Sequence, residues 1–145
     1  MPVTHLDALR FELPCDPKYL VAVRLAVAGA AARAGLTVED IHDLKVAVCE
    51  ACNNCIEHAF TEEERASGAA RMRITVLVGD GEVRIEVEDS GRGFDPKHVT
   101  AAVDSDTPRT EGLGLFVIKQ MTDQMHIESA PGSGTKISFV KRQSR

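Results

Sequence analysis

The sequence has few aromatic residues and no excess of positive charge. It contains five Phe, one Tyr and no Trp, so it offers little surface for stacking nucleic-acid bases. Its 17 Lys and Arg are outnumbered by 22 Asp and Glu, which gives a net charge of −5. Nucleic-acid binders usually carry a basic face, so the composition argues against that class. The length of 145 residues is enough for one domain with a buried core, without a staple of disulfides or metal.

A long apolar run and an export signal are also absent. The longest uncharged apolar stretch near the start, residues 25–32, is far shorter than the roughly 20 residues that span a membrane. The first residues show no basic region followed by an apolar core, so we expect no secretion signal, no membrane association and a cytoplasmic location. The four cysteines, Cys15, Cys49, Cys52 and Cys55, are then expected to be reduced thiols.

Local patterns predict an α+β fold, with helices packed on one face of a mixed, mainly antiparallel sheet. Asp16 before Pro17 signals a helix start, and Gly35 signals its end. Thr37 and Asp40 form a capping-box-like pattern before a second helix. Alternating apolar and polar residues around Gly-containing turns indicate two hairpins. We expect one domain over 1–145, with strands over 6–13, 71–78, 83–88, 125–130 and 135–140, helices over 16–34, 37–60 and 112–124, and loose segments at 61–70 and 96–111.

A helical wheel divides the helix over 37–60 into two faces. Glu50, Asn54 and His58 lie one turn apart on one face and form a polar ridge that could point into a cleft. The alternative is an ordinary solvated face, because Glu-x-x-x-Asn occurs by chance in many helices. The apolar residues share the other arc, which is typical of a buried stripe; they are Ile41, Leu44, Val48, Ala51, Cys52, Cys55, Ile56 and Ala59.

Three of the cysteines have the spacing C-x-x-C-x-x-C, which invites a metal or iron–sulfur interpretation. On a helix, however, Cys49, Cys52 and Cys55 fan around the axis, and a cluster would need a fourth ligand and a loop to gather the thiols. Cys52 and Cys55 lie in the apolar arc, where free cysteine behaves as a small hydrophobic residue. We therefore favour packing and expect no metal on these thiols.

Three glycine-containing segments follow along the chain. Residues 89–94, Asp-Ser-Gly-Arg-Gly-Phe, leave a strand and allow close backbone approach beside a carboxylate. Residues 111–115, Glu-Gly-Leu-Gly-Leu, open a helix whose N–H groups favour phosphate, although they match neither the Walker nor the Rossmann fingerprint. Residues 132–135, Gly-Ser-Gly-Thr, lie between two strands. Each segment alone is an ordinary turn or helix start, but their order and spacing together are informative.

This order of motifs resembles the boxes of the GHKL (histidine-kinase-like) ATPase superfamily. The matching residues are Glu50-x-x-x-Asn54, Asp89-x-Gly91-x-Gly93, Gly112-x-Gly114 and Gly134-Thr135. The resemblance covers residues 36–141 and agrees with the Bergerat-type sandwich of that superfamily. Residues 48–60, residues 111–118 and the short length are most similar to the bacterial anti-sigma-factor serine/threonine kinases.

The resemblance implies a role for each matching residue. Glu50 would be the general base toward the attacking hydroxyl, and Asn54 would bind the Mg²⁺ that bridges the phosphates of ATP. Asp89 would accept a hydrogen bond from the adenine amino group. The remaining nucleotide-binding residues would be Gly91 and Gly93 near the base, Thr135 supporting the adenine, and Gly112, Leu113, Gly114 and Leu115 at the phosphates. Residues 96–111 would be the ATP lid, in which we interpret Arg109 as a solvated arginine, and His58 receives no specific role.

The resemblance also implies partners. A member of this family would bind a sigma factor, phosphorylate a small STAS-type anti-sigma-factor antagonist on Ser or Thr, and form a homodimer, partly through residues 6–35. One alternative is the detached catalytic domain of a sensor histidine kinase, although only about 35 residues precede the helix of Glu50 and His5 is not in a helical pattern. Another is a regulator that binds ATP without transferring phosphate, against which the intact Glu50 and Asn54 argue.

Overall fold

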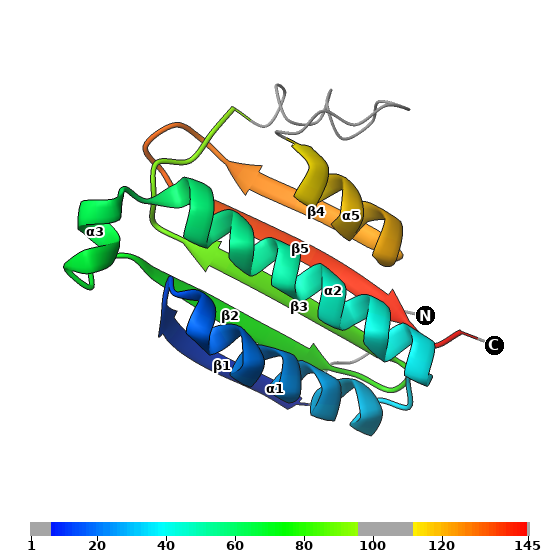
Figure 1. Ribbon diagram of the computed structural model, residues 1–145. Helices are drawn as coiled ribbons and strands as arrows, with labels where there is room; N and C mark the ends of the chain where they lie inside the picture. Colours follow the sequence, from blue (N-terminus) through cyan, green and yellow to red (C-terminus); the bar gives the residue numbers. More distant parts are fainter. Residues whose placement is uncertain (1–6, 96–111, 145) are drawn as a thin grey trace.

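The computed structural model describes residues 7–95 and 112–144. They form two layers, a five-stranded sheet of order β1-β2-β3-β5-β4 and a layer of helices on one of its faces (Figure 1). The strands are β1 (Asp7–Pro14), β2 (Arg71–Val78), β3 (Glu82–Asp89), β4 (Gln124–Ser129) and β5 (Thr135–Arg142). The helical elements are the 3-10 turn η1 (Pro17–Tyr19), α1 (Leu20–Arg33), α2 (Val38–Asn54), the π-helical turn η2 (Cys55–Ala59), α3 (Glu62–Ala66) and α5 (Leu113–Met121). The expected α+β sandwich is confirmed.

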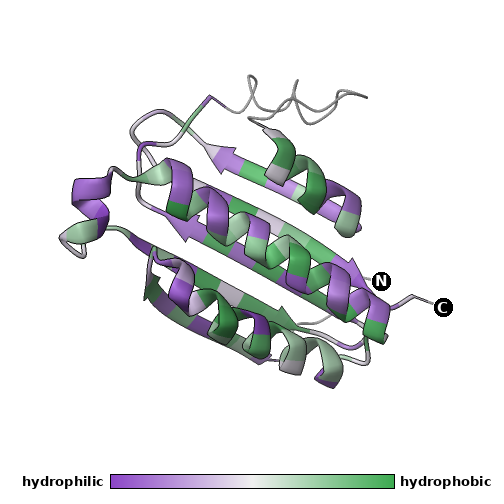
Figure 2. Ribbon diagram, in the orientation of Figure 1, coloured by the Kyte–Doolittle hydropathy of each residue, from purple (hydrophilic) through white to green (hydrophobic). Residues whose placement is uncertain are grey.

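Alternation along the strands gives the sheet one apolar and one polar face, visible as alternating colours in Figure 2. In β2, Met72 and Ile74 are buried under the helices, whereas Arg73 is exposed on the open face. The register places Arg73 between Glu12 of β1 and Glu88 of β3, and its guanidinium lies 2.8 Å from the Glu12 carboxylate. The open face therefore consists of cross-strand charge pairs, and the helix-covered face forms the core.

Helix α2 lies over the middle of the sheet, in contact with β3 and β5 and between α1 and α5 (Figure 1). The predicted apolar arc is confirmed, since Leu44, Val48, Ala51 and Cys52 have 0% of their surface exposed. Burial of such a stripe supplies most of the stability of a helix in water. Packing of this apolar stripe against the sheet therefore determines where the opposite, polar face of α2 points.

The predicted signals at the first two helices are confirmed by their hydrogen bonds. Asp16 accepts from the backbone N–H of Lys18, and Gly35 follows α1 with a φ of +87°. Thr37 Oγ1 accepts from the N–H of Asp40 at 3.1 Å, and Asp40 Oδ2 accepts from the N–H of Thr37 at 3.2 Å. Asp at the third position thus completes a capping box that usually carries Glu or Gln.

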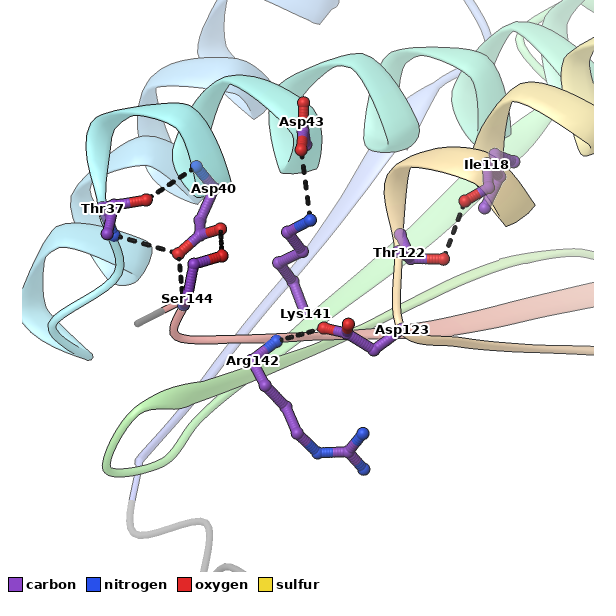
Figure 3. A network of polar contacts seen from close by, with 9 residues as sticks. All are labelled: Thr37, Asp40, Asp43, Ile118, Thr122, Asp123, Lys141, Arg142 and Ser144. Carbon is purple, nitrogen blue, oxygen red and sulfur yellow. Dashed lines mark hydrogen bonds and ion pairs between the residues drawn. The ribbon is translucent and has the colours of Figure 1, made fainter.

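The last described residues are tied to the start of α2 through the same carboxylate (Figure 3). Asp40 also accepts hydrogen bonds from the backbone N–H of Ser144, at 2.9 Å, and from its hydroxyl. Nearby, Lys141 of β5 pairs with Asp43 of α2 at 3.1 Å. Burial by itself would raise the pKa of Asp40, but the hydrogen bonds from Ser144 and Thr37 outweigh burial and lower it to about 2. This network anchors the N-terminal end of α2 to the sheet.

Two expectations about the sheet and its last helix were wrong. The sheet is not mixed, because every strand pair within the described residues is antiparallel. The helix expected to run to residue 124 ends at Met121, because Gln124 already pairs with Val140 as the first residue of β4.

Two segments near the middle of the chain also differ from expectation. The segment over 61–70, expected to be loose, contains α3, which begins with a second capping box between Thr61 and Glu64. The helix over 37–60 does continue to Ala59, but it changes from α- to π-helical winding at Cys55. The apolar residues that the wheel placed in its buried arc, Cys55, Ile56 and Ala59, are nevertheless buried in this turn.

The expected lid, residues 96–111 with Arg109, lies outside the described residues, as does the start of the expected first strand. Among residues 7–95 and 112–144, no helix is both long and apolar enough to cross a membrane.

Candidate functional site

One end of the sheet carries polar side chains on the face that the helices cover. The register pairs Asp89, the last residue of β3, with Thr135, the first residue of β5, and pairs Thr135 with Ser129 at the end of β4. Alternation from the buried Val87 and Ile137 places these side chains on the helix-covered face. The fold therefore brings together Asp89 and Thr135, which the sequence had placed in separate motifs.

Both oxygens of the Asp89 carboxylate accept hydrogen bonds. Oδ1 accepts from the N–H of Gly91 at 2.8 Å, a local turn of the Asx kind. Oδ2 accepts from the thiol of Cys55 in η2, with Sγ at 3.2 Å. A carboxylate has about four lone-pair sites, so both oxygens keep capacity for another donor. The group is oriented by the protein and can still accept a hydrogen bond from an amino group of a ligand.

Backbone segments approach each other around Asp89 so closely that three positions require glycine. Gly93 and Gly134 have φ values of +65° and +76°, which disfavour other residues. A Cβ on Gly93 would lie 2.1 Å from the carbonyl oxygen of Ala130, and one on Gly134 would lie 2.2 Å from that of Asp89. A Cβ on Gly91 would lie 2.3 Å from a carbonyl oxygen of η2. At each of these glycines, backbone of a neighbouring segment occupies the space that a side chain would need.

Ser129 connects three parts of the same region and was not singled out from the sequence. Its hydroxyl donates to the carbonyl oxygen of Gly134 at 2.9 Å, lies 2.8 Å from Thr135 Oγ1 and accepts from the N–H of Phe94 at 2.9 Å. The available signal was a serine at a position where the alternation of β4 predicts an apolar residue. Ser129 thereby fixes the hydroxyl of Thr135 and the segment after β3.

Helix α2 brings the acidic and amide candidates close to the start of α5. Glu50 and Asn54 lie one turn apart near the end of α2, and both are half-buried. A Cβ on Gly114 would lie 3.0 Å from Glu50 Oε2, so glycine leaves room for the carboxylate beside the first turn of α5. Gly112 caps α5 without a side-chain hydrogen bond, and the first N–H groups of a helix favour an anion.

The two leucines of this glycine segment have different environments. Leu115 is buried in the core and holds α5 on the sheet, whereas Leu113 is 48% exposed. Their expected contribution to phosphate binding is therefore through backbone N–H groups at the start of the helix rather than through their side chains.

His58 does not follow Glu50 and Asn54 by the spacing of an α-helix. The π-helical turn begins at Cys55, between Asn54 and His58, and changes the direction of the later side chains. His58 is exposed, and its Nε2 lies 3.7 Å from the carboxylate of the neighbouring Glu57. Glu50 and Asn54 are thus half-buried on α2, whereas His58 is exposed on the π-helical turn that follows.

The packing interpretation of the cysteines is confirmed for Cys52 and Cys55, which are 0% and 1% exposed, while Cys49 is half-buried. Burial raises the pKa of Cys52 to about 12. Burial and the charge of Asp89 raise the pKa of Cys55 well above its usual value. Both groups are therefore neutral thiols near pH 7. In the part of the chain that the structure describes, no three His, Cys, Asp or Glu side chains are grouped to hold a metal ion.

The donors present fit a magnesium–nucleotide ligand. The side-chain oxygen of Asn54 is of the hard type that Mg²⁺ prefers, and Mg²⁺ usually keeps only one or two protein ligands beside phosphate and water. A hollow of 440 Å³ opens at this end of the sheet and is lined both by Asp89, Ser129 and Thr135 and by the open-face residues Glu88, Glu128 and Lys136. This volume is within the ordinary range of small-molecule sites.

Comparison with protein families assigns most of the sequence to one known domain family. The family model described as "Histidine kinase-like ATPase domain" matches residues 13–141. The serine-protein kinase RsbW of Bacillus velezensis is 31% identical over 143 residues, covering 95% of this chain and 87% of that protein. RsbW of Listeria monocytogenes serovar 1/2a is 33% identical over 131 residues, covering 86% of this chain and 81% of that protein.

Two solved structures share the fold. The RsbU and RsbW domains of Rv1364c from Mycobacterium tuberculosis match with a TM-score of 0.67 at 23% identity, covering 96% of this chain and 32% of that chain. The SiaB–SiaC complex from Pseudomonas aeruginosa matches with a TM-score of 0.64 at 13% identity, covering 91% of this chain and 88% of that chain. At these identities the structures support the fold and not a particular activity.

Proposed function

We propose a function on the premise that this chain belongs to the family of histidine kinase-like ATPase domains and resembles its RsbW serine-protein kinases. The proposed reaction is transfer of the γ-phosphoryl group of ATP to a Ser or Thr of a protein. The observation that carries the proposal is the position of α2. Its Glu50 lies beside the first turn of α5, and its continuation through Cys55 contacts Asp89. This continuous helix therefore carries Glu50, lies beside the anion-favouring start of α5 and contacts the oriented carboxylate of Asp89.

The adenine would bind at the end of the sheet. The Asp89 carboxylate, oriented by two hydrogen bonds, would accept one from the adenine amino group. Gly93 would lie against the base, because its lack of a side chain leaves only backbone at this point. Thr135, whose hydroxyl contacts Ser129, would support the base from the neighbouring strand.

The phosphates would bind where α2 meets α5. The backbone N–H groups from Gly112 to Leu115 would receive phosphate oxygens at the helix N-terminus. Asn54 would hold Mg²⁺ through its side-chain oxygen, and the ion would supply neutralisation of phosphate charge. Residues 96–111 are proposed as the lid over this site.

In the transfer step, Glu50 would act on the protein nucleophile. Its carboxylate would accept the proton of the Ser or Thr hydroxyl, whose oxygen forms a bond to the γ-phosphorus while the bond from that phosphorus to the β–γ bridging oxygen breaks and ADP leaves. The position of Glu50 beside Gly114 supports this role, because an acid next to the phosphate-binding turn can reach an incoming hydroxyl.

The proposed partners follow from the relatives. RsbW is named a serine-protein kinase, and SiaB was solved in a complex with SiaC. We propose that this protein binds a sigma factor and phosphorylates a STAS-type antagonist of it. For the proposed homodimer, the surface around β1 and α1 is a suitable face, since Leu9, Val21 and Leu25 are 42%, 54% and 69% exposed.

The experiment is a search for the phosphorylated protein. Wild type and Glu50→Ala would each be incubated with Mg-ATP and a soluble extract of the source organism, and new phosphosites would be mapped by mass spectrometry. We expect one small protein to gain phosphoserine or phosphothreonine with wild type only. ATP binding by both proteins, measured by calorimetry, is the control for an intact nucleotide site.

Equal labelling by Glu50→Ala would remove the proposed general base. No labelled protein, despite ATP binding by wild type, would favour a regulator that binds ATP without transferring phosphate. A phosphohistidine in place of phosphoserine or phosphothreonine would favour a histidine-kinase catalytic domain.

A further inference from the structure

The turn η2 starts at the residue whose side chain reaches across to β3. Cys55 is 1% exposed, and its Sγ lies 3.2 Å from Asp89 Oδ2, a contact between residues 34 positions apart in the chain. The same residue marks the change from α- to π-helical winding. Such π-turns frequently occur at functional sites, because they redirect side chains that regular winding would point elsewhere.

The geometry assigns a specific task to this thiol. The N–H of Gly91 fixes Oδ1 of Asp89 at 2.8 Å, so a donor on Oδ2 is what sets the rotation of the carboxylate plane. We propose that Cys55 is a positioning residue, whose S–H holds the Asp89 carboxylate in the orientation that selects adenine. This inference rests on the proposed function, in which Asp89 accepts the adenine amino group.

A thiol suits this task better than a stronger donor. The S–H group is a weak donor, so it orients the carboxylate while leaving most of its negative charge for a ligand. Sγ of Cys55 lies 3.2 Å from Asp89 Oδ2, and because a carboxylate oxygen accepts hydrogen bonds, the sulfur is the donor in this contact. The contact is therefore a hydrogen bond to an anion and not a repulsion between two anions.

The test separates positioning from packing by measuring nucleobase selection. The full chain and its variants would be titrated with ATP and with inosine triphosphate, in which a carbonyl oxygen replaces the adenine amino group. The quantity compared is the preference for ATP, which is the dissociation constant of inosine triphosphate divided by that of ATP. A residue that only fills space would change both constants alike and leave this ratio unchanged.

Cys55→Ala is the main variant, and Cys55→Val fills the site without a donor should the alanine variant fail to fold. We expect either variant to lower the preference for ATP by about three- to tenfold, the range for loss of one modest hydrogen bond. Cys55→Ser retains a donor and should keep most of the preference. Cys52→Ala is the matched control, because Cys52 is equally buried one turn earlier on the same helix.

The outcomes distinguish this inference from the proposed function. An unchanged ratio in Cys55→Ala or Cys55→Val, with a reduced ratio in Asp89→Asn, would overturn the role of Cys55 and leave Asp89 as the acceptor. Equal binding of ATP and inosine triphosphate by both wild type and Asp89→Asn would overturn the role of Asp89, and with it that of Cys55.

Discussion

At the scale of single residues, the absence of a side chain at Gly114 leaves room for the Glu50 carboxylate. A Cβ at this position would stand 3.0 Å from Glu50 Oε2, close enough that the carboxylate must shift. We expect Gly114→Ala to lower phosphoryl transfer by about tenfold or more, because small displacements of a catalytic group are costly. Helix stability should not fall, because alanine favours the helix. Single-turnover rates and thermal melting measure the two effects.

Gly29 provides the matched substitution in another helix. It lies exposed within α1, and a Cβ there would meet nothing within 4 Å. Gly29→Ala should therefore raise the free energy of unfolding by about 0.5–1 kcal/mol and leave transfer unchanged. Equal transfer rates in Gly114→Ala and Gly29→Ala would show that Gly114 does not control the position of Glu50.

At the scale of elements, two helices begin with the same capping box but differ in what the box supports. Thr37 starts α2, whose apolar stripe is buried, whereas Thr61 starts α3, which has no buried residue. We expect Thr37→Ala to cost about 1 kcal/mol of unfolding free energy, as for other lost N-caps. Thr61→Ala should cost much less, because α3 can fray without opening the core. Urea denaturation of both variants gives the comparison, and equal losses would contradict it.

The same elements show which features of the fold the sequence patterns could predict. The strands were predicted to within one or two residues, because alternation reports directly on a sheet with one buried face. Helix α3 was missed because its five residues, Glu-Glu-Glu-Arg-Ala, have no apolar face to form a period, although its capping box was visible. The antiparallel pairing of β1 with β2 could not be deduced, since α1, α2 and α3 separate these strands and such a connection allows either direction.

The site shows a different limit of sequence reasoning. Motif spacing identified Asp89 and Thr135 separately, but only strand register made them neighbours. The wheel correctly placed Cys55 among buried residues, and for that reason its contact with Asp89 was not foreseen. Ser129 was overlooked because it belongs to no motif and acts through hydrogen bonds that depend on the tertiary fold.

At the scale of the whole molecule, one buried carboxylate links the last described residues to the start of α2. Asp40 receives hydrogen bonds from Thr37 and Ser144, which lower its pKa to about 2, compared with about 3.9 in an unfolded chain. Because the folded pKa is the lower one, this stabilisation is fully present above about pH 4 and is lost as the pH falls through about 2. Its size is about 2 kcal/mol.

We therefore expect wild type to lose about 2 kcal/mol more unfolding free energy than Asp40→Asn between pH 5 and pH 2. Denaturant melts across this range measure the difference, and Ser144→Ala should reduce it. If the free energy of unfolding falls equally with pH in wild type and Asp40→Asn, protonation of Asp40 does not contribute to the loss of stability at low pH.

The exposed α3 also has a consequence for engineering. It adds nothing to the core, and Gly68 just beyond it has open space around its α-carbon. Exposed segments of this kind are where a polypeptide accepts insertions or new termini. The segment leaves η2 directly after Ala59, whose carbonyl oxygen accepts from the N–H of Arg92 at 3.0 Å. A fluorescent domain inserted at Gly68 would therefore be attached near the proposed base-binding end, and we expect this loop to suit a genetically encoded nucleotide reporter.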